Sequence, residues 1–209
     1  MLKAFIRERM NIIDKTIIHR FHEMRSNEFG EGSSQALGWV DDQSQQLRFE
    51  MLAGIGDMNG CSVLDIGCGH GDLSATLFNK YPKRHYSGIE QVETFLNIAT
   101  TRYGNLPNTT FYLGDCSSAE LPMADYVLAS GSLSYRTSEP NFIYHMISKL
   151  FSTCRIGFGF NLLSKVNTPG GILMAYDVLD ILTYCRSLSS KVVLHDEYCE
   201  GDFTVWMYK

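Results

Sequence analysis

The sequence predicts an α/β fold of three layers, with helices on both faces of a seven-stranded, mostly parallel β-sheet. From residue 60 onward, short β-rich runs alternate with helical patterns, which is typical of a parallel sheet. The last two predicted strands have no helix between them, so they should form an antiparallel hairpin at one edge. Helical patterns precede this alternation. We therefore predict a helical extension or cap over residues 1–59 and one compact domain over residues 60–209.

The predicted extension contains two helices. Over residues 5–21, apolar residues recur at steps of three and four, which predicts one apolar stripe along a helix. Residues 29–38 contain Gly and Ser and interrupt the pattern. A second helix is predicted over residues 42–55, where glycines mark its end. This segment could pack over a ligand crevice of the sheet.

The predicted domain follows the order of its apolar runs. Short β-rich runs bounded by turn residues are typical of buried strands, and longer runs with three- and four-residue steps are typical of helices. The strands are predicted at residues 62–66, 84–90, 110–113, 124–129, 155–163, 191–195 and 203–208, and the helices at 72–81, 92–103, 142–151 and 173–186.

Composition excludes several classes of protein. The chain has 209 residues, 44% of them hydrophobic, and a net charge of -5, which argues against a disordered chain. There is no apolar stretch of the roughly 18 residues that a membrane helix needs, and no signal-peptide pattern. The six cysteines lack metal-ligand spacing. We therefore expect a cytoplasmic protein with reduced thiols, with no metal and no membrane or nucleic-acid partner.

The strongest motif lies where the first predicted strand ends. Asp65 is followed by Gly67, Gly69 and Gly71, and a helix begins at Asp72. Glycines allow a sharp turn and a close approach of a ligand to the backbone. Dinucleotide binders want their third glycine where Asp72 stands, and a carboxylate there opposes a pyrophosphate. An acid inside the loop instead suits a ligand that carries an ammonium group.

This pattern resembles motif I of the class I S-adenosylmethionine-dependent methyltransferases, whose glycine loop wraps the methionine part of the cofactor. The resemblance extends from about residue 61 to the C-terminus and implies a Rossmann-like sheet. Glu90 ends the second strand, where the family carries an acid for the ribose hydroxyls. Asp115 and the residue after it resemble the motif that addresses the adenine. The implied cofactor-binding residues are Asp65, Gly67, Cys68, Gly69, Gly71, Glu90, Gln91, Asp115, Cys116, Ser117, Ser130 and Gly131.

The resemblance implies in-line transfer of a methyl group, helped by proximity and orientation of the two reactants. After the fourth strand the chain reads Ser-Gly-Ser-Leu from Ser130, not the N/D-P-P-Y/F tetrapeptide of enzymes that methylate nucleic-acid amines. Tyr135 and His195 follow strand ends and are the catalytic candidates; a histidine has the pKa of a base. Arg48 is either a partner for the cofactor carboxylate or a solvated charge, and Trp39 is either a packing residue or a lid.

We expect the acceptor to be a small molecule. Two alternatives are a methyltransferase that acts on a protein or peptide, and a non-catalytic module of the same fold that binds a nucleotide cofactor. An exposed groove would favour the first alternative, and binding of NAD alone would favour the second. The sequence does not indicate the acceptor atom, a general base or the oligomeric state.

Overall fold

The computed structural model describes residues 10–168 and 170–209 of the chain. Phe5 and Ile6 of the first predicted helix lie outside these residues. The elements are, in chain order, α1 (Ile12–Phe29), the 3-10 turn η1 (Gln35–Leu37), α2 (Asp42–Ala53), β1 (Ser62–Ile66), α3 (Asp72–Lys80), β2 (His85–Glu90), α4 (Glu93–Tyr103), β3 (Thr109–Leu113), β4 (Ala124–Ala129), α5 (Phe142–Thr153), β5 (Cys154–Leu163), α6 (Val178–Leu188), β6 (Lys191–His195) and β7 (Asp202–Tyr208).

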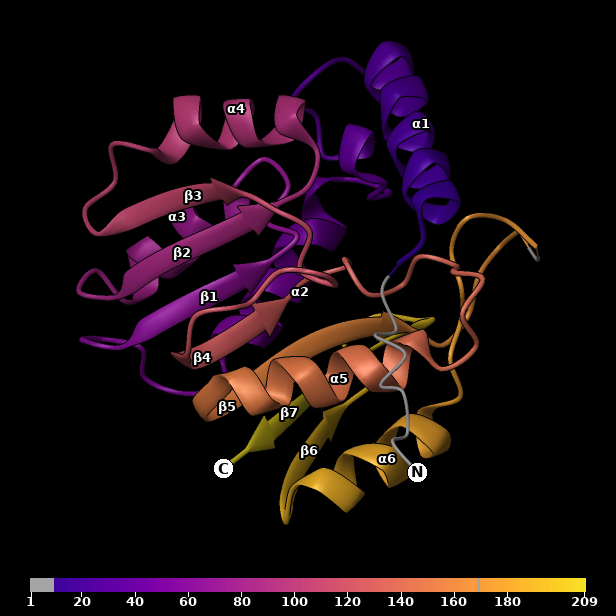
Figure 1. Cartoon of the computed structure of the whole chain (residues 1–209). Helices are drawn as coiled ribbons and strands as arrows, with labels where there is room; N and C mark the ends of the chain where they lie inside the picture. The colour runs from indigo at the N-terminus through magenta and orange to yellow at the C-terminus, as the bar shows by residue number, and fades with distance from the viewer. Residues whose placement is uncertain (1–9, 169) are drawn as a thin grey trace, which may run out of the picture.

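The sheet confirms the predicted fold class. Its strand order is β3-β2-β1-β4-β5-β7-β6 (Figure 1). Neighbouring strands are parallel except at β7, which is antiparallel to both β5 and β6. The order reverses between β1 and β4, and in open parallel sheets such a reversal opens a crevice outside the carboxyl ends of the strands. The functional site is therefore expected at the end of β1.

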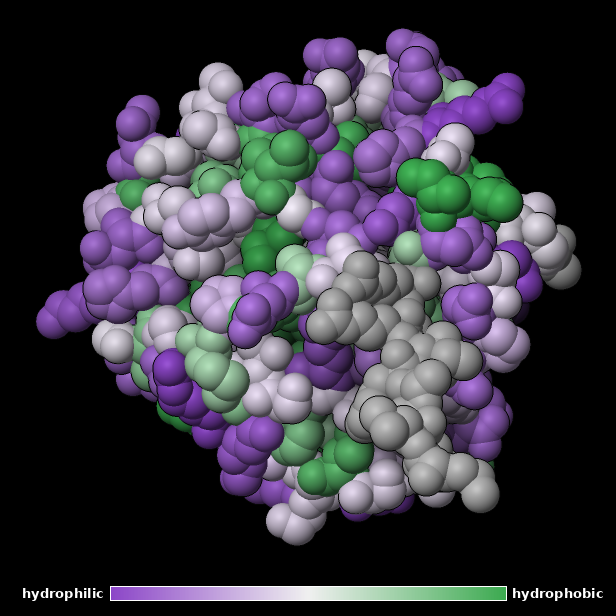
Figure 2. Space-filling view, viewed as in Figure 1, coloured by the Kyte–Doolittle hydropathy of each residue, from purple (hydrophilic) through white to green (hydrophobic). Residues whose placement is uncertain are grey.

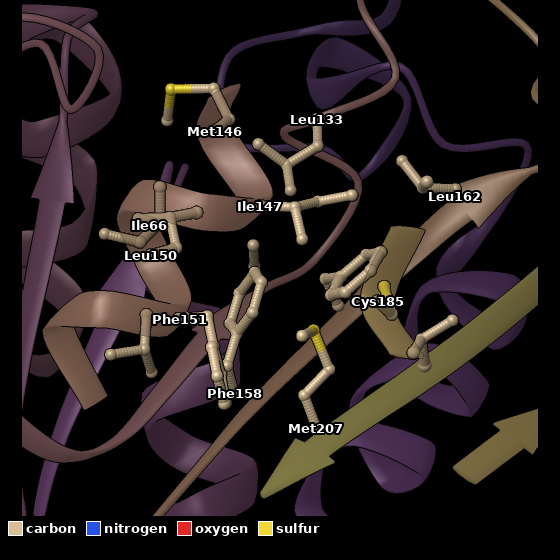
Figure 3. Close-up of a cluster of buried hydrophobic side chains, with 14 of the residues drawn as sticks. Ile66, Leu133, Met146, Ile147, Leu150, Phe151, Phe158, Leu162, Cys185 and Met207 are labelled. Atoms are coloured by element: carbon tan, nitrogen blue, oxygen red, sulfur yellow. The ribbon is translucent and has the colours of Figure 1, made fainter. Parts of the chain in front are cut away.

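Buried side chains cover both faces of the sheet. On one face, α5 and α6 pack on β4, β5 and β7 through a cluster that includes Ile147, Leu150 and Phe158 (Figure 3). On the other face, α2 and α3 bury residues such as Leu52 and Leu77 against β1. Each face is closed by helices, as the buried apolar strands require, and the carboxyl ends of the strands are left for a ligand.

Helix α1 differs from its prediction. It extends to Phe29, and its buried residues are Asp14, Ile18 and His22. Ile13 and Ile17, which belong to the predicted apolar stripe, are 66% and 52% exposed. Hydrophobic atoms are visible on the surface beside the start of α1 (Figure 2). Periodicity therefore found the helix and gave the wrong buried face, because polar contacts with distant loops orient α1.

Helix α6 begins at Val178, not at residue 173 as predicted. Asp177 caps it by accepting hydrogen bonds from the amides of Leu179 and Asp180. The preceding residues are extended, since Leu173 forms a bridge with Tyr135. The apolar pattern continues across this boundary, so periodicity alone could not locate the cap.

Candidate cofactor and acceptor site

A cavity of about 750 Å³ lies at the carboxyl ends of β1, β2 and β4. This volume falls within the range of roughly 300–1,000 Å³ that is usual for cofactor and small-molecule sites. Residues after the strand ends form one part of the lining, and residues from α1, η1 and α2 form the other. Every predicted cofactor-binding residue except Gly71 lines this cavity, and so does Tyr135.

The glycine loop has the backbone that only glycine adopts readily. Gly67, Gly69 and Gly71 all have positive φ, from +55° to +81°. A Cβ added at Gly67 would lie 2.5 Å from the Cβ of Ser132, and one at Gly69 would lie 2.9 Å from Leu37. The protein's own side chains therefore leave no room for a Cβ at Gly67 or Gly69. Gly71 packs away from the cavity and supports the turn.

Glu90 joins the end of β2 to the glycine loop. Its carboxylate accepts hydrogen bonds from the backbone N–H groups of Gly69 (2.9 Å), Gln91 (2.8 Å) and Val92 (2.9 Å). Burial raises the pKa of Glu90, and these three bonds oppose the shift. A carboxylate has about four acceptor positions, so about one remains for a ligand hydroxyl. The sequence predicts bonds from both ribose hydroxyls. The second hydroxyl would have to share an acceptor position of Glu90 with one of the three backbone N–H groups.

Asp65 is the most deeply buried carboxyl group of the site, at 2% exposure. The hydroxyl of Tyr86 donates to its Oδ2. Burial raises the pKa of Asp65 to about 7; the Tyr86 bond opposes this shift, and the nearby Glu90 adds to it. A cationic ligand would favour the ionised form. Asp65 therefore fits the ammonium group that the sequence assigned to it.

Asp115 is already saturated with donors. Its carboxylate pairs with Lys15 of α1 and accepts bonds from the backbone N–H and hydroxyl of Ser117 and from the hydroxyl of Ser118. Burial alone would raise its pKa, but these donors outweigh burial and lower it to about 2. An adenine amine would have to displace one of them, and Lys15 is the partner that belongs to a separate element.

The end of β4 meets a chain of hydrogen bonds that reaches the cap. The hydroxyl of Ser130 donates to Asn161 (3.1 Å), and the amide of Asn161 donates to Thr204 (2.6 Å). The chain continues through Tyr198 to Asp202 at the start of β7. Asp202 also forms a buried ion pair with Arg48 of α2.

Of the two sequence interpretations of Arg48, the solvated charge is wrong, and the contact with the cofactor carboxylate stays a prediction. Its guanidinium is buried against Asp202, lies 5.0 Å from the ring centroid of Trp39 and lines the cavity. Trp39 lines the cavity and lies over Gly131, where an added Cβ would be 2.6 Å from the ring. Arg48 thus anchors α2 and Trp39 over the site.

The sequence did not indicate His22. Its Nδ1 lies 3.0 Å from the carbonyl oxygen of Ala36, and its Nε2 lies 2.8 Å from the hydroxyl of Tyr135. A carbonyl only accepts, so Nδ1 carries the proton and Nε2 accepts from Tyr135. Burial lowers the pKa of His22 to about 4, so the ring is neutral. A single histidine on a helix, 113 residues from its partner, leaves no signal in the sequence.

The other catalytic candidate does not reach the cavity. His195 ends the edge strand β6 and packs on Trp206, with ring centroids 4.1 Å apart. It is absent from the cavity lining. Cys68 and Cys116 line the cavity, and burial raises the pKa of both thiols, which disfavours a nucleophilic role. Within residues 10–168 and 170–209 no cluster of three His, Cys, Asp or Glu side chains could hold a metal ion.

Residues 63–155 match the family described as "Methyltransferase domain". They contain β1 with the glycine loop, Glu90, Asp115 and β4, which are the parts that build the cavity. In this match and in its fold, the chain is similar to the class I S-adenosylmethionine-dependent methyltransferases.

Three known proteins illustrate the relationship. A Mycobacterium tuberculosis protein named as a methyltransferase is 28% identical over 158 residues, which are 71% of this chain and 93% of that protein. The malonyl-[acyl-carrier protein] O-methyltransferase of Bacillus anthracis is 33% identical over 70 residues, 34% of this chain and 26% of that enzyme. The magnesium protoporphyrin IX methyltransferase of Synechocystis PCC 6803, solved with S-adenosylhomocysteine, covers 94% of this chain and 99% of its own at a TM-score of 0.68. At 19% identity, this last comparison shows a shared fold.

Proposed function

We propose that the chain is an S-adenosylmethionine-dependent methyltransferase that acts on a small-molecule acceptor, which is enclosed with the cofactor in one cavity. The observation that carries the proposal is the roof of the cavity. Residues of α1, η1 and α2, among them His22, Leu37 and Trp39, line the same space as the glycine loop. A protein or peptide acceptor would need an open groove beside the cofactor. The roof therefore favours a compact acceptor, and one of the similar structures is an enzyme named for a porphyrin.

The residues present fit S-adenosylmethionine. We assign the methionine ammonium to Asp65 and a ribose hydroxyl to Glu90. We assign the adenine to the loop at Asp115, where its amine would replace Lys15 as a hydrogen-bond donor to the carboxylate. The remaining predicted cofactor-binding residues, apart from Gly71, line the same walls. When bound, the cofactor supplies an activated methyl group. The protein's part is to orient the acceptor in line and to exclude water, which can contribute roughly 7–11 kcal/mol to lowering the barrier.

Cofactor binding tests the site assignment. Calorimetry should show binding of S-adenosylmethionine and none of NAD. Asp65→Asn and Glu90→Gln should each weaken binding, because each replaces a carboxylate that faces the cavity by a neutral group. A matched control is Asp125→Asn, a carboxylate at the opposite end of the sheet, bonded to Ser62. Unchanged affinity in both site variants would show that the assignment is wrong.

The acceptor class is tested by following formation of S-adenosylhomocysteine. Small metabolites, peptides and nucleic acids are supplied as separate pools, with Glu90→Gln as the inactive control. Turnover with the small-metabolite pool alone is expected. Turnover with peptides alone would establish the alternative acceptor, and tight, salt-dependent binding of nucleic acid would refute the predicted lack of such a partner. Of the described helices, none has the length and apolar character needed to cross a membrane; the cytoplasmic location stays a prediction from the sequence.

A further inference from the structure

A hydrogen-bonded pair in the cavity wall can take up a proton. The oxygen of Tyr135 donates its hydrogen to His22 Nε2 and keeps lone pairs that can accept from a ligand. His22 is fixed from the other side, because its Nδ1 donates to Ala36. The backbone of Tyr135 is fixed as well, by its bridge with Leu173. Both side chains line the cavity.

A second observation places a polar ligand group at the same wall. Ser134, next to Tyr135 in the chain, is 3% exposed and lines the cavity. Its hydroxyl has no hydrogen-bond partner among the described residues. A buried hydroxyl without a partner costs about 1–3 kcal/mol. A polar atom of a bound molecule beside Ser134 and Tyr135 would remove this cost.

We propose that Tyr135 and His22 accept the proton of a neutral phenolic or enolic hydroxyl on the acceptor, so that the hydroxyl oxygen becomes the nucleophile. This proposal rests on the proposed function, since it names the acceptor chemistry of the same cavity. Tyr135 touches the acceptor and is the catalytic residue. His22 acts through Tyr135 and is a positioning residue that holds the proton.

The step balances in atoms and charge. The acceptor oxygen forms a bond to the methyl carbon while the carbon–sulfur bond breaks, its electron pair staying on sulfur. The acceptor proton moves to the oxygen of Tyr135, and the proton of Tyr135 moves to His22 Nε2. Positive charge lost at sulfur is thus replaced by an imidazolium in the same cavity. Burial lowers the pKa of His22 to about 4, so the proton leaves for solvent when the site opens.

Electrostatics of the wall select this acceptor class. A cationic amine would place a second positive charge beside the sulfonium, and it would meet Arg25, which also lines the cavity. A carboxylate acceptor needs no proton acceptor. Negative charge beside Tyr135 is also disfavoured, because burial first and Glu90 next raise the pKa of Tyr135 and outweigh Arg25, which lowers it. A neutral hydroxyl avoids both costs. Because buried His22 is a weak base, the hydroxyl must be an acidic one, as in phenols and enols, and Phe21, Trp39 and Phe142 offer an aromatic surface.

Acceptor probes of matched size test the class. Phenol, 4-nitrophenol, benzyl alcohol, benzylamine and benzoate are each incubated with the enzyme and S-adenosylmethionine, and S-adenosylhomocysteine is measured. Turnover of the phenols above the other three is expected. Preference for benzylamine, benzoate or benzyl alcohol would overturn the proposal, and so would the absence of turnover with both phenols.

Variants of the pair test the route of the proton. Tyr135→Phe and His22→Gln should each lower kcat for the phenol by about 10²–10⁴-fold. The double variant should be no slower than the slower single variant, because both belong to one route. Tyr176→Phe is the matched control: its hydroxyl lies 3.4 Å from the carbonyl oxygen of Leu133, and it does not line the cavity. If the two single-variant losses of kcat multiply in the double variant, or if Tyr176→Phe loses as much, Tyr135 and His22 have a structural role and the proposed proton route is wrong.

A readout without turnover separates the two proposals. In protein labelled with ¹⁵N-histidine and saturated with S-adenosylhomocysteine, adding 4-nitrophenol should shift the Nε2 resonance of His22. The shift should vanish in Tyr135→Phe, while calorimetry still shows cofactor binding. An unshifted His22 in protein that binds both molecules would overturn only the proton route. Failure to bind S-adenosylmethionine would instead overturn the proposed function.

Discussion

The glycine loop and the α1–α2 segment form opposite walls of one cavity, but they are built in different ways. A hydrogen bond that holds the loop to β2 joins Gly69 to Glu90, 21 residues away, and the more distant Ser132 packs against Gly67. The α1–α2 segment is held by partners 100 or more residues away, as in Lys15 with Asp115 and Arg48 with Asp202. We call the glycine-loop side the cofactor wall and the α1–α2 side the acceptor wall, after the roles that we propose for them. The cofactor wall depends largely on a local motif, and the acceptor wall depends on the completed fold.

The largest effect is expected at the anchor of the distant wall. Arg48→Met leaves Asp202 as a buried carboxylate without its cation, and such losses cost about 3–5 kcal/mol of unfolding free energy. The double variant Arg48→Met/Asp202→Asn should recover part of this loss in urea unfolding. The control is Arg155→Met, whose exposed pair with Asp125 should contribute only about 0.2–1 kcal/mol. Equal losses of unfolding free energy in Arg48→Met and Arg155→Met would contradict the proposal that Arg48 anchors α2.

A slightly smaller effect is expected at the local wall. Gly67→Ala forces a side chain into positive φ and against Ser132, which should cost about 1–2 kcal/mol for the backbone and about 1–3 kcal/mol for the overlap. Gly60→Ala has a similar φ of +75° and meets nothing within 4 Å, so it isolates the backbone cost. Urea unfolding measures both. Equal losses would mean that the contact with Ser132 is immaterial.

Cofactor affinity should depend on pH through Asp65. With a pKa of about 7, the ionised fraction of this carboxyl is about 1/11 at pH 6, 1/2 at pH 7 and 10/11 at pH 8. If the ammonium group binds the ionised form, affinity for S-adenosylmethionine should rise about five-fold from pH 6 to 7 and about two-fold from pH 7 to 8.

The same raised pKa has the opposite consequence for the free protein. Between about pH 4 and 7 the folded state binds more protons at Asp65 than the unfolded state, so this group's contribution to stability falls as pH rises. Calorimetry at the three pH values checks the affinity. Asp65→Asn should remove the pH dependence of the affinity for S-adenosylmethionine. A pH dependence that survives in this variant would have to come from another group.

The smallest effect is expected where the two walls meet. Lys15→Met frees one acceptor position on Asp115 and removes a partly exposed ion pair of about 0.2–1 kcal/mol. Because adenine no longer competes with Lys15, affinity for S-adenosylmethionine should increase by up to about five-fold. Lys191→Met, on the edge strand β6, should leave affinity unchanged. Weaker binding in Lys15→Met would show that Lys15 supports the cofactor.

Sequence patterns alone were sufficient to predict the sheet and the closing hairpin. Strand patterns, glycines suited to positive φ and acids at strand ends are local properties. The structure places Asp65, Gly67 and Glu90 in the cavity lining, and their binding of the cofactor stays a prediction. Tyr135 could be selected as well, because strand ends of a parallel sheet converge at one edge. The exclusion of His195 from the lining was not predictable, since an edge strand can end at the right side of the sheet and still lie too far along it.

The acceptor wall, in contrast, is defined only by tertiary packing. The buried face of α1 is set by Asp14 and His22, which hydrogen-bond to loops after β4, and hydrophobic periodicity carries no information about such polar partners. Arg48 and Asp202 form their ion pair only when α2 packs against β7. The physical reason is the range of the interactions. Backbone geometry is dictated by neighbouring residues, whereas a hydrogen-bonded pair such as Tyr135 and His22 exists only when distant segments have already packed together.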